Sequence, residues 1–80
     1  MRLPRDVSGS QLISALRSFG YEIDRQSGSH VRITTSESGV HHLTIPNHNP
    51  IKLGTLAAIL DDVAEHFKLS RDELLFRLKL

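Results

Sequence analysis

The residues of this sequence best suited to chemistry lie in a short glycine-containing segment, RQSGSH, at positions 25–30. Its last residue, His30, carries an imidazole, the side chain that most readily takes or gives a proton near neutral pH. Gly28 can turn the backbone tightly before it, and Arg25 and Arg32 flank it with positive charge. A histidine held in this way could act on a phosphodiester. A single histidine in a small protein is more often a surface or half-buried residue than a catalyst, so these residues alone favour the non-catalytic interpretation.

Patterns for other catalytic chemistries are weaker. Ser29 beside His30 does not indicate a nucleophile and its base, because adjacent strand residues point to opposite faces. The sequence contains neither the G-x-S-x-G turn of a serine nucleophile nor the G-x-x-x-x-G-K-[ST] loop of nucleotide hydrolases. Asp61 and Asp62 are adjacent on a predicted helix and diverge, so we interpret them as part of a solvated helical face.

Three histidines, His41, His42 and His48, offer a competing hypothesis, a zinc site formed where a strand turns into a loop. No strict spacing among them fixes the geometry that zinc requires. We therefore expect neither a metal nor a cofactor, and keep zinc as the alternative.

The first element that must position these residues is an amphipathic helix at about Gly9–Phe19. Ser8 and Gln11 fit an S-x-x-Q capping box at its start, and Gly20 can provide a left-handed end. Residues 1–7 lack periodicity and are predicted to form an irregular lead-in.

Three strands follow, because the apolar period changes from helical to two. They are predicted at Tyr21–Gln26, Val31–Thr35 and Val40–Ile45. The short connections between them favour an antiparallel meander.

Side-chain alternation along these strands assigns the histidines to faces. If Val31 faces the core, then His30 and Arg32 face the other side of the sheet. On the third strand the same rule sends His42 outward, as a predicted neighbour of His30, and leaves His41 as a partly covered residue on the inner side.

A loop at 46–53, containing His48 and Lys52, leads to a second helix that opens at Gly54-Thr55 and continues to Phe67. A second capping box, at residues 70–73, begins a short last helix. The predicted fold class is α+β, with the order α-β-β-β-α and an extra C-terminal helix. Its helices cover one face of a three-stranded antiparallel sheet and leave the other face free to bind.

Composition limits what the protein can be. Eighty residues suffice for one domain, residues 1–80, and the absence of cysteine excludes disulfides and thiolate metal sites. Residues 1–60 hold six basic and four acidic side chains, a mild excess compatible with nucleic acid. No apolar run approaches the ~18 residues of a membrane helix, and no secretory signal begins the sequence. We expect a soluble, cytoplasmic protein.

Several segments together resemble the HicA family of mRNA-interferase toxins, in the family's order and spacing. They are Ser8-Gly9, Phe19-Gly20-Tyr21, the RQSGSH segment, Thr44-Ile45-Pro46-Asn47-His48, and Gly54-Thr55-Leu56 leading to Ile59-Leu60. The resemblance implies a fold like that of a double-stranded-RNA-binding domain, ribosome-independent cleavage of mRNA, and neutralisation by a HicB antitoxin. It also implies that His30 is catalytic, which reverses the interpretation that the residues alone favour.

The resulting prediction is a metal-independent endoribonuclease in which His30 removes a proton from a ribose 2′-hydroxyl. The residues expected to contact RNA are Arg25, Ser29, Arg32, His42, His48 and Lys52. The proton donor for the leaving oxygen stays open between the protonated His30 and another group such as His42.

The competing function is a non-catalytic RNA-binding or antitoxin-binding module of the same fold. Departures from the family pattern at Ser27, Val31, Asp61 and Asp62 favour it. The retained Gly28-Ser29-His30 favours the enzyme.

Overall fold

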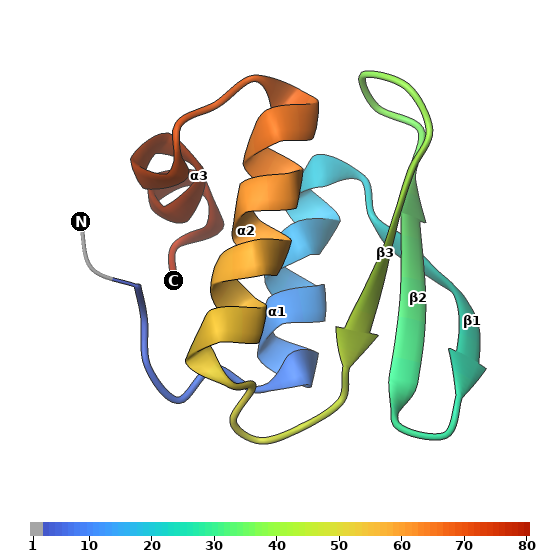
Figure 1. Cartoon of the computed structure of the whole chain (residues 1–80). Helices are drawn as coiled ribbons and strands as arrows, with labels where there is room; N and C mark the ends of the chain where they lie inside the picture. The colour runs from blue at the N-terminus through green and yellow to red at the C-terminus, as the bar shows by residue number, and fades with distance from the viewer. Residues whose placement is uncertain (1–2) are drawn as a thin grey trace.

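A computed structural model describes residues 3–80, and within them the chain forms an N-terminal helix, three strands and two further helices (Figure 1). This is the α-β-β-β-α order with an extra C-terminal helix that the sequence predicts. The first two residues of the predicted lead-in, Met1 and Arg2, lie outside the described residues. None of the helices in residues 3–80 has the length and apolarity needed to cross a membrane.

Helix α1 (Gly9–Leu16) begins where the sequence predicts it. The Gln11 amide donates to Ser8 Oγ at 3.1 Å, and the Ser8 amide donates to Gln11 Oε1 at 2.8 Å, which completes the capping box. A 3-10 turn, Arg17–Phe19, tightens the end of the helix, and Gly20 stops it with φ of 83°. The predicted extent is therefore confirmed, with its last turn wound more tightly than an α-helix.

Strands β1 (Glu22–Ser27), β2 (His30–Thr35) and β3 (His41–Pro46) form an antiparallel sheet in the order β1-β2-β3. Each boundary lies within one residue of its predicted position. Val40 is the one residue predicted in the third strand that lies outside it, and its side chain is exposed.

A β-bulge in β1 changes which face Arg25 occupies. Strict alternation would place Arg25 on the same face as Ile23, but the register shifts between them, so that Ile23 pairs with Ile33 while Arg25 pairs with Arg32. Arg25 therefore joins Arg32 on the face that the helices leave uncovered, which we call the open face.

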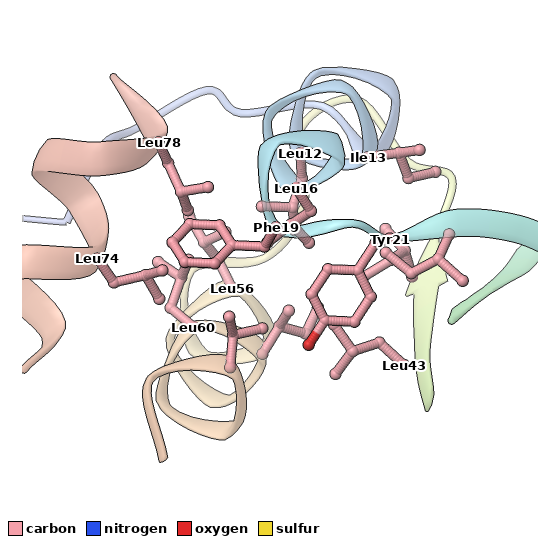
Figure 2. Close-up of a cluster of buried hydrophobic side chains, with 14 of the residues drawn as sticks. Leu12, Ile13, Leu16, Phe19, Tyr21, Leu43, Leu56, Leu60, Leu74 and Leu78 are labelled. Atoms are coloured by element: carbon pink, nitrogen blue, oxygen red, sulfur yellow. The ribbon is translucent and has the colours of Figure 1, made fainter. Parts of the chain in front are cut away.

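Helices α2 (Leu53–Phe67) and α1 cover the other face of the sheet, and α3 (Arg71–Leu78) lies against them on the side away from the strands (Figure 1). Figure 2 shows the side chains that fill the space between these layers. The labelled residues are Leu12, Ile13, Leu16, Phe19, Tyr21, Leu43, Leu56, Leu60, Leu74 and Leu78. The apolar residues of all three helices are thus buried together, and the open face of the sheet remains available.

An ion pair attaches the last helix to the second. Arg71 donates from Nε and Nη2 to the two carboxylate oxygens of Asp61, at 2.9 and 2.8 Å. These hydrogen bonds hold the pKa of Asp61 below its usual value. Asp61 and Asp62 diverge as predicted, and each has a partner on another element rather than in the other carboxylate.

Candidate active site

His30 is placed by the hairpin between β1 and β2. Ser27 and His30 pair across a two-residue turn, in which Gly28 has φ of 57°. A Cβ at Gly28 would meet nothing within 4 Å. Glycine is therefore favoured there because of the positive φ of the backbone and not because space is lacking. Val31 is buried among the helices, and alternation turns the exposed His30 to the open face, as predicted.

The loop after β3 is attached to the same hairpin through the main chain. Pro46 pairs with His30 in the sheet register, and the next amide, that of Asn47, donates to the Ser29 carbonyl at 2.6 Å. The carbonyl of His48 in turn accepts a hydrogen bond from the Gly9 amide at 2.9 Å. The backbone at His48 is therefore held by two hydrogen bonds, one made by the amide of the preceding residue and one by its own carbonyl.

Gly9 permits this close contact between α1 and the loop. A Cβ there would lie 2.6 Å from the Pro46 carbonyl oxygen and 2.8 Å from the Asn47 Cα. Both are backbone atoms, so a larger residue would push the loop away from α1. The Ile51 amide also donates to the Val7 carbonyl at 2.8 Å, which fixes the far end of the loop.

These attachments create a cleft of about 370 Å³ lined by His30, Pro46, His48, Lys52 and Thr55. The sequence predicted His30, His48 and Lys52 as site residues, and the structure brings all three to this one cleft. The other two lining residues, Pro46 and Thr55, were not predicted from the sequence. Thr55 follows Lys52 by less than one helical turn, so the predicted helix start was the signal that could have identified it.

The cleft lies at the N-terminal end of α2. Lys52 is the N-cap residue, its side chain makes no capping hydrogen bond, and the first turn contains no acidic residue. The first amides of a helix lack intrahelical acceptors and carry partial positive charge. Together with the Lys52 ammonium group, they make this side of the cleft suitable for an anion such as a phosphate.

The predicted proximity of His42 to His30 is wrong. His42 pairs with Thr34, four residues along β2 from His30, which corresponds to about 13 Å. Alternation gave the correct face, because both are exposed on the open face, but it could not give the register. Thr34 Oγ1 lies 2.7 Å from His42 Nδ1, so His42 is held at the far end of the strand.

The two arginines predicted to contact RNA lie side by side on the open face, in register with each other, outside the cleft. Arg32 Nε donates to Asp24 Oδ1 at 2.8 Å, and Thr34 Oγ1 donates to the second oxygen of the same carboxylate at 2.5 Å. These hydrogen bonds lower the pKa of Asp24, and the hydrogen bond from Arg32 makes the largest contribution. Asp24 therefore offsets much of the positive charge of Arg32.

The three histidines of the zinc hypothesis are separated by the fold. His41 lies on the helix side of the sheet, His42 at the far end of the open face, and His48 at the cleft. No group of three or more His, Asp or Glu side chains in residues 3–80 is arranged to hold a metal ion. The hypothesis that these three histidines form a zinc site is therefore wrong.

His41 instead belongs to a structural cluster that the sequence did not reveal. Its Nε2 donates to Asp62 Oδ1 at 3.1 Å, and its Nδ1 lies 2.7 Å from the hydroxyl of buried Tyr21. The ring stacks on His66, with 4.4 Å between centroids, and His66 Nε2 donates to the carbonyl of Gly39. Burial, with a smaller contribution from Asp62, raises the pKa of Tyr21. The prediction of a partly covered His41 is confirmed.

Comparison with known proteins adds one result. A family model described as the HicA toxin of bacterial toxin-antitoxin systems matches residues 9–64, which include all the residues that line the cleft. Searches of curated proteins and of solved structures found no match.

Proposed function

The chain belongs to the HicA toxin family, and we propose that it is the endoribonuclease toxin of a toxin–antitoxin pair, cleaving mRNA at the cleft around His30. The observation that carries this proposal is that one cleft is lined by both the exposed His30 imidazole and Lys52, at a helix N-terminus that has no side-chain cap. An imidazole can move a proton near neutral pH, and the positive side can hold the phosphate on which the reaction takes place.

In the proposed reaction His30 accepts the proton of a ribose 2′-hydroxyl. The resulting oxygen attacks the adjacent phosphorus, the bond from phosphorus to the 5′-oxygen breaks, and the products end in a 2′,3′-cyclic phosphate and a 5′-hydroxyl. RNA supplies this nucleophile itself, whereas DNA does not. Lys52 and the first amides of α2 hold the non-bridging oxygens, so the reaction requires no metal ion.

The rest of the RNA is proposed to lie along the open face from the cleft. Ser29 and His48 contact the phosphate nearest the reaction, and Arg25, Arg32 and His42 contact the strand beyond it. Since Asp24 already pairs with Arg32, the phosphate contacts at Arg32 are expected to contribute less than those at Lys52.

Cleavage of RNA by purified protein tests the function. An oligonucleotide of DNA with one ribonucleotide should be cut after that ribonucleotide in excess EDTA, leaving a 2′,3′-cyclic phosphate, and the all-DNA control should stay intact. Loss of cleavage in EDTA with rescue by zinc would contradict the metal-free reaction. Binding of RNA without any cleavage would instead support the binding-module alternative.

For the partner, we propose a HicB-like antitoxin that covers the cleft and the adjacent open face, in the cytoplasm where mRNA is present. A complementary, partly acidic surface would block His30 without unfolding the toxin. Hydrogen exchange on the complex should show protection at β2 and at residues 46–55. Protection confined to α3 would contradict this mode of inhibition.

A further inference from the structure

Two histidines line the cleft, from segments that are far apart in the sequence. His30 begins β2 and His48 lies in the loop after β3, and they share the cleft with Pro46, Lys52 and Thr55. Resting on the proposed function, we propose that His48 is the general acid of the reaction, the residue that donates a proton to the leaving 5′-oxygen. His30 and His48 then form an acid–base pair in which each ring has one role.

The main chain holds this pair together. The hydrogen bond from the Asn47 amide to the Ser29 carbonyl joins the residues directly before His48 and His30, at 2.6 Å. The Gly9 amide holds the His48 carbonyl, and the lack of a Cβ on Gly9 allows α1 to approach. Such support from two other elements is expected of a residue that must keep a fixed position relative to the reacting atoms.

Other groups are less suited to the role. The ammonium group of Lys52 and the hydroxyl of Thr55 are the other polar side chains that line the cleft, and both release a proton less readily than imidazole near neutral pH. His42 lies about 13 Å from His30 along the sheet. His30 is also less suited, because it holds the proton that it has just accepted on the side of the phosphate where the 2′-oxygen attacks, and not beside the leaving 5′-oxygen.

The proton balance of the step is complete. His30 accepts the proton of the 2′-hydroxyl while the bond from the 2′-oxygen to phosphorus forms. The bond from phosphorus to the 5′-oxygen breaks, and the protonated His48 gives its proton to that oxygen. The reaction ends with His30 protonated and His48 neutral, and exchange with water restores both rings.

A substrate that needs no acid separates this role from binding. When sulfur replaces the bridging 5′-oxygen, the leaving thiolate departs without being protonated. His48→Ala and His48→Gln should each lose about 10²–10⁴-fold in rate on the oxygen substrate, and most of that loss should disappear on the sulfur substrate. His30→Ala should remain impaired on both. His66→Ala, which changes a histidine of the structural cluster away from the cleft, serves as the matched control and should cut both at the wild-type rate.

Three results would overturn the assignment. If His48→Ala lost the same factor on both substrates, or if His48→Gln kept the wild-type rate on the oxygen substrate, His48 would be a binding or positioning residue. In that case the cleavage by the wild-type protein would leave the proposed function intact. A wild-type protein that is folded by circular dichroism and cuts neither substrate would overturn the proposed function and the acid role together.

Discussion

The Ser29 carbonyl accepts a hydrogen bond from the Asn47 amide at 2.6 Å, and this contact brings together the two segments that carry the candidate catalytic histidines. It extends the β2–β3 pairing beyond His30 and Pro46. The β1–β2 turn and the loop after β3 thus behave as one unit. The cleft depends on that unit and on its contact with α1.

Gly9→Ala tests the contribution of the α1 contact. Its Cβ would lie 2.6 Å from the Pro46 carbonyl oxygen, so the loop must shift. Overpacking of this kind costs about 1–3 kcal/mol of unfolding free energy, and cleavage should fall because His48 moves with the loop. Urea denaturation and a cleavage assay measure the two effects.

Gly54→Ala is the matched control for stability. A Cβ at Gly54 meets nothing within 4 Å, and alanine favours a helix over glycine by about 0.8–1 kcal/mol. The variant should therefore be as stable as the wild type or more so. The account of the α1 contact fails if Gly9→Ala is equally well tolerated.

Lys52 and Arg32 should contribute differently to RNA binding, because Asp24 pairs with Arg32 at 2.8 Å while Lys52 lines the cleft. Lys52→Ala should weaken binding of single-stranded RNA and reduce the slope of log affinity against log salt by about 0.7, the value for one phosphate contact. Arg32→Ala should change the slope less, and Asp24→Asn should increase affinity. Titrations at several salt concentrations decide this, and equal effects of the two alanine variants would contradict it.

Local sequence patterns were sufficient to predict the elements of this fold. Both capping boxes form, at Ser8 and at Ser70, because their hydrogen bonds join residues only three positions apart. The stop at Gly20 likewise depends on one residue's backbone freedom. Period-two alternation placed His30 on the open face for the same reason, since it follows from the geometry of a single strand.

The sequence predicted the antiparallel meander but could not supply the register of its strands. The register, which sets Pro46 rather than His42 opposite His30, depends on pairing across the sheet, and the bulge that turns Arg25 beside Arg32 interrupts alternation. The ion pair of Asp24 with Arg32 joins two strands and was missed for the same reason. The cleft is formed by three segments, namely the start of β2, the end of β3 with the loop after it, and the start of α2, so no local pattern predicts it.

His41→Ala should reduce stability and leave cleavage unchanged. The substitution removes the hydrogen-bond partner of the buried Tyr21 hydroxyl and the contact with Asp62. An unsatisfied buried hydroxyl costs about 1–3 kcal/mol. Chemical denaturation should show this loss, while the rate of RNA cleavage below the denaturation midpoint stays at the wild-type value. A fall in activity with unchanged stability would place His41 in the reaction instead.

Tyr21 makes the fold sensitive to alkaline pH. Burial raises the pKa of Tyr21 above its usual value, so the folded chain keeps a phenolic proton that the unfolded chain releases above about pH 10. The unfolded state then binds fewer protons, and the free energy of unfolding falls as pH rises. Tyr21→Phe should flatten this decline between pH 10 and 12, as followed by denaturant melts. Parallel declines in both proteins would contradict the role of Tyr21.

The measurement that tests the central claim most directly is the rate of RNA cleavage by His30→Ala, made beside a circular dichroism spectrum and an RNA-binding titration. Removal of a general base costs about 10²–10⁴ in rate. The fold should stay within about 0.5 kcal/mol of the wild type, because His30 is exposed on the open face. We predict a folded protein that binds RNA and no longer cuts it. A folded His30→Ala protein that cuts RNA at the wild-type rate would contradict the assignment of His30 as the catalytic base.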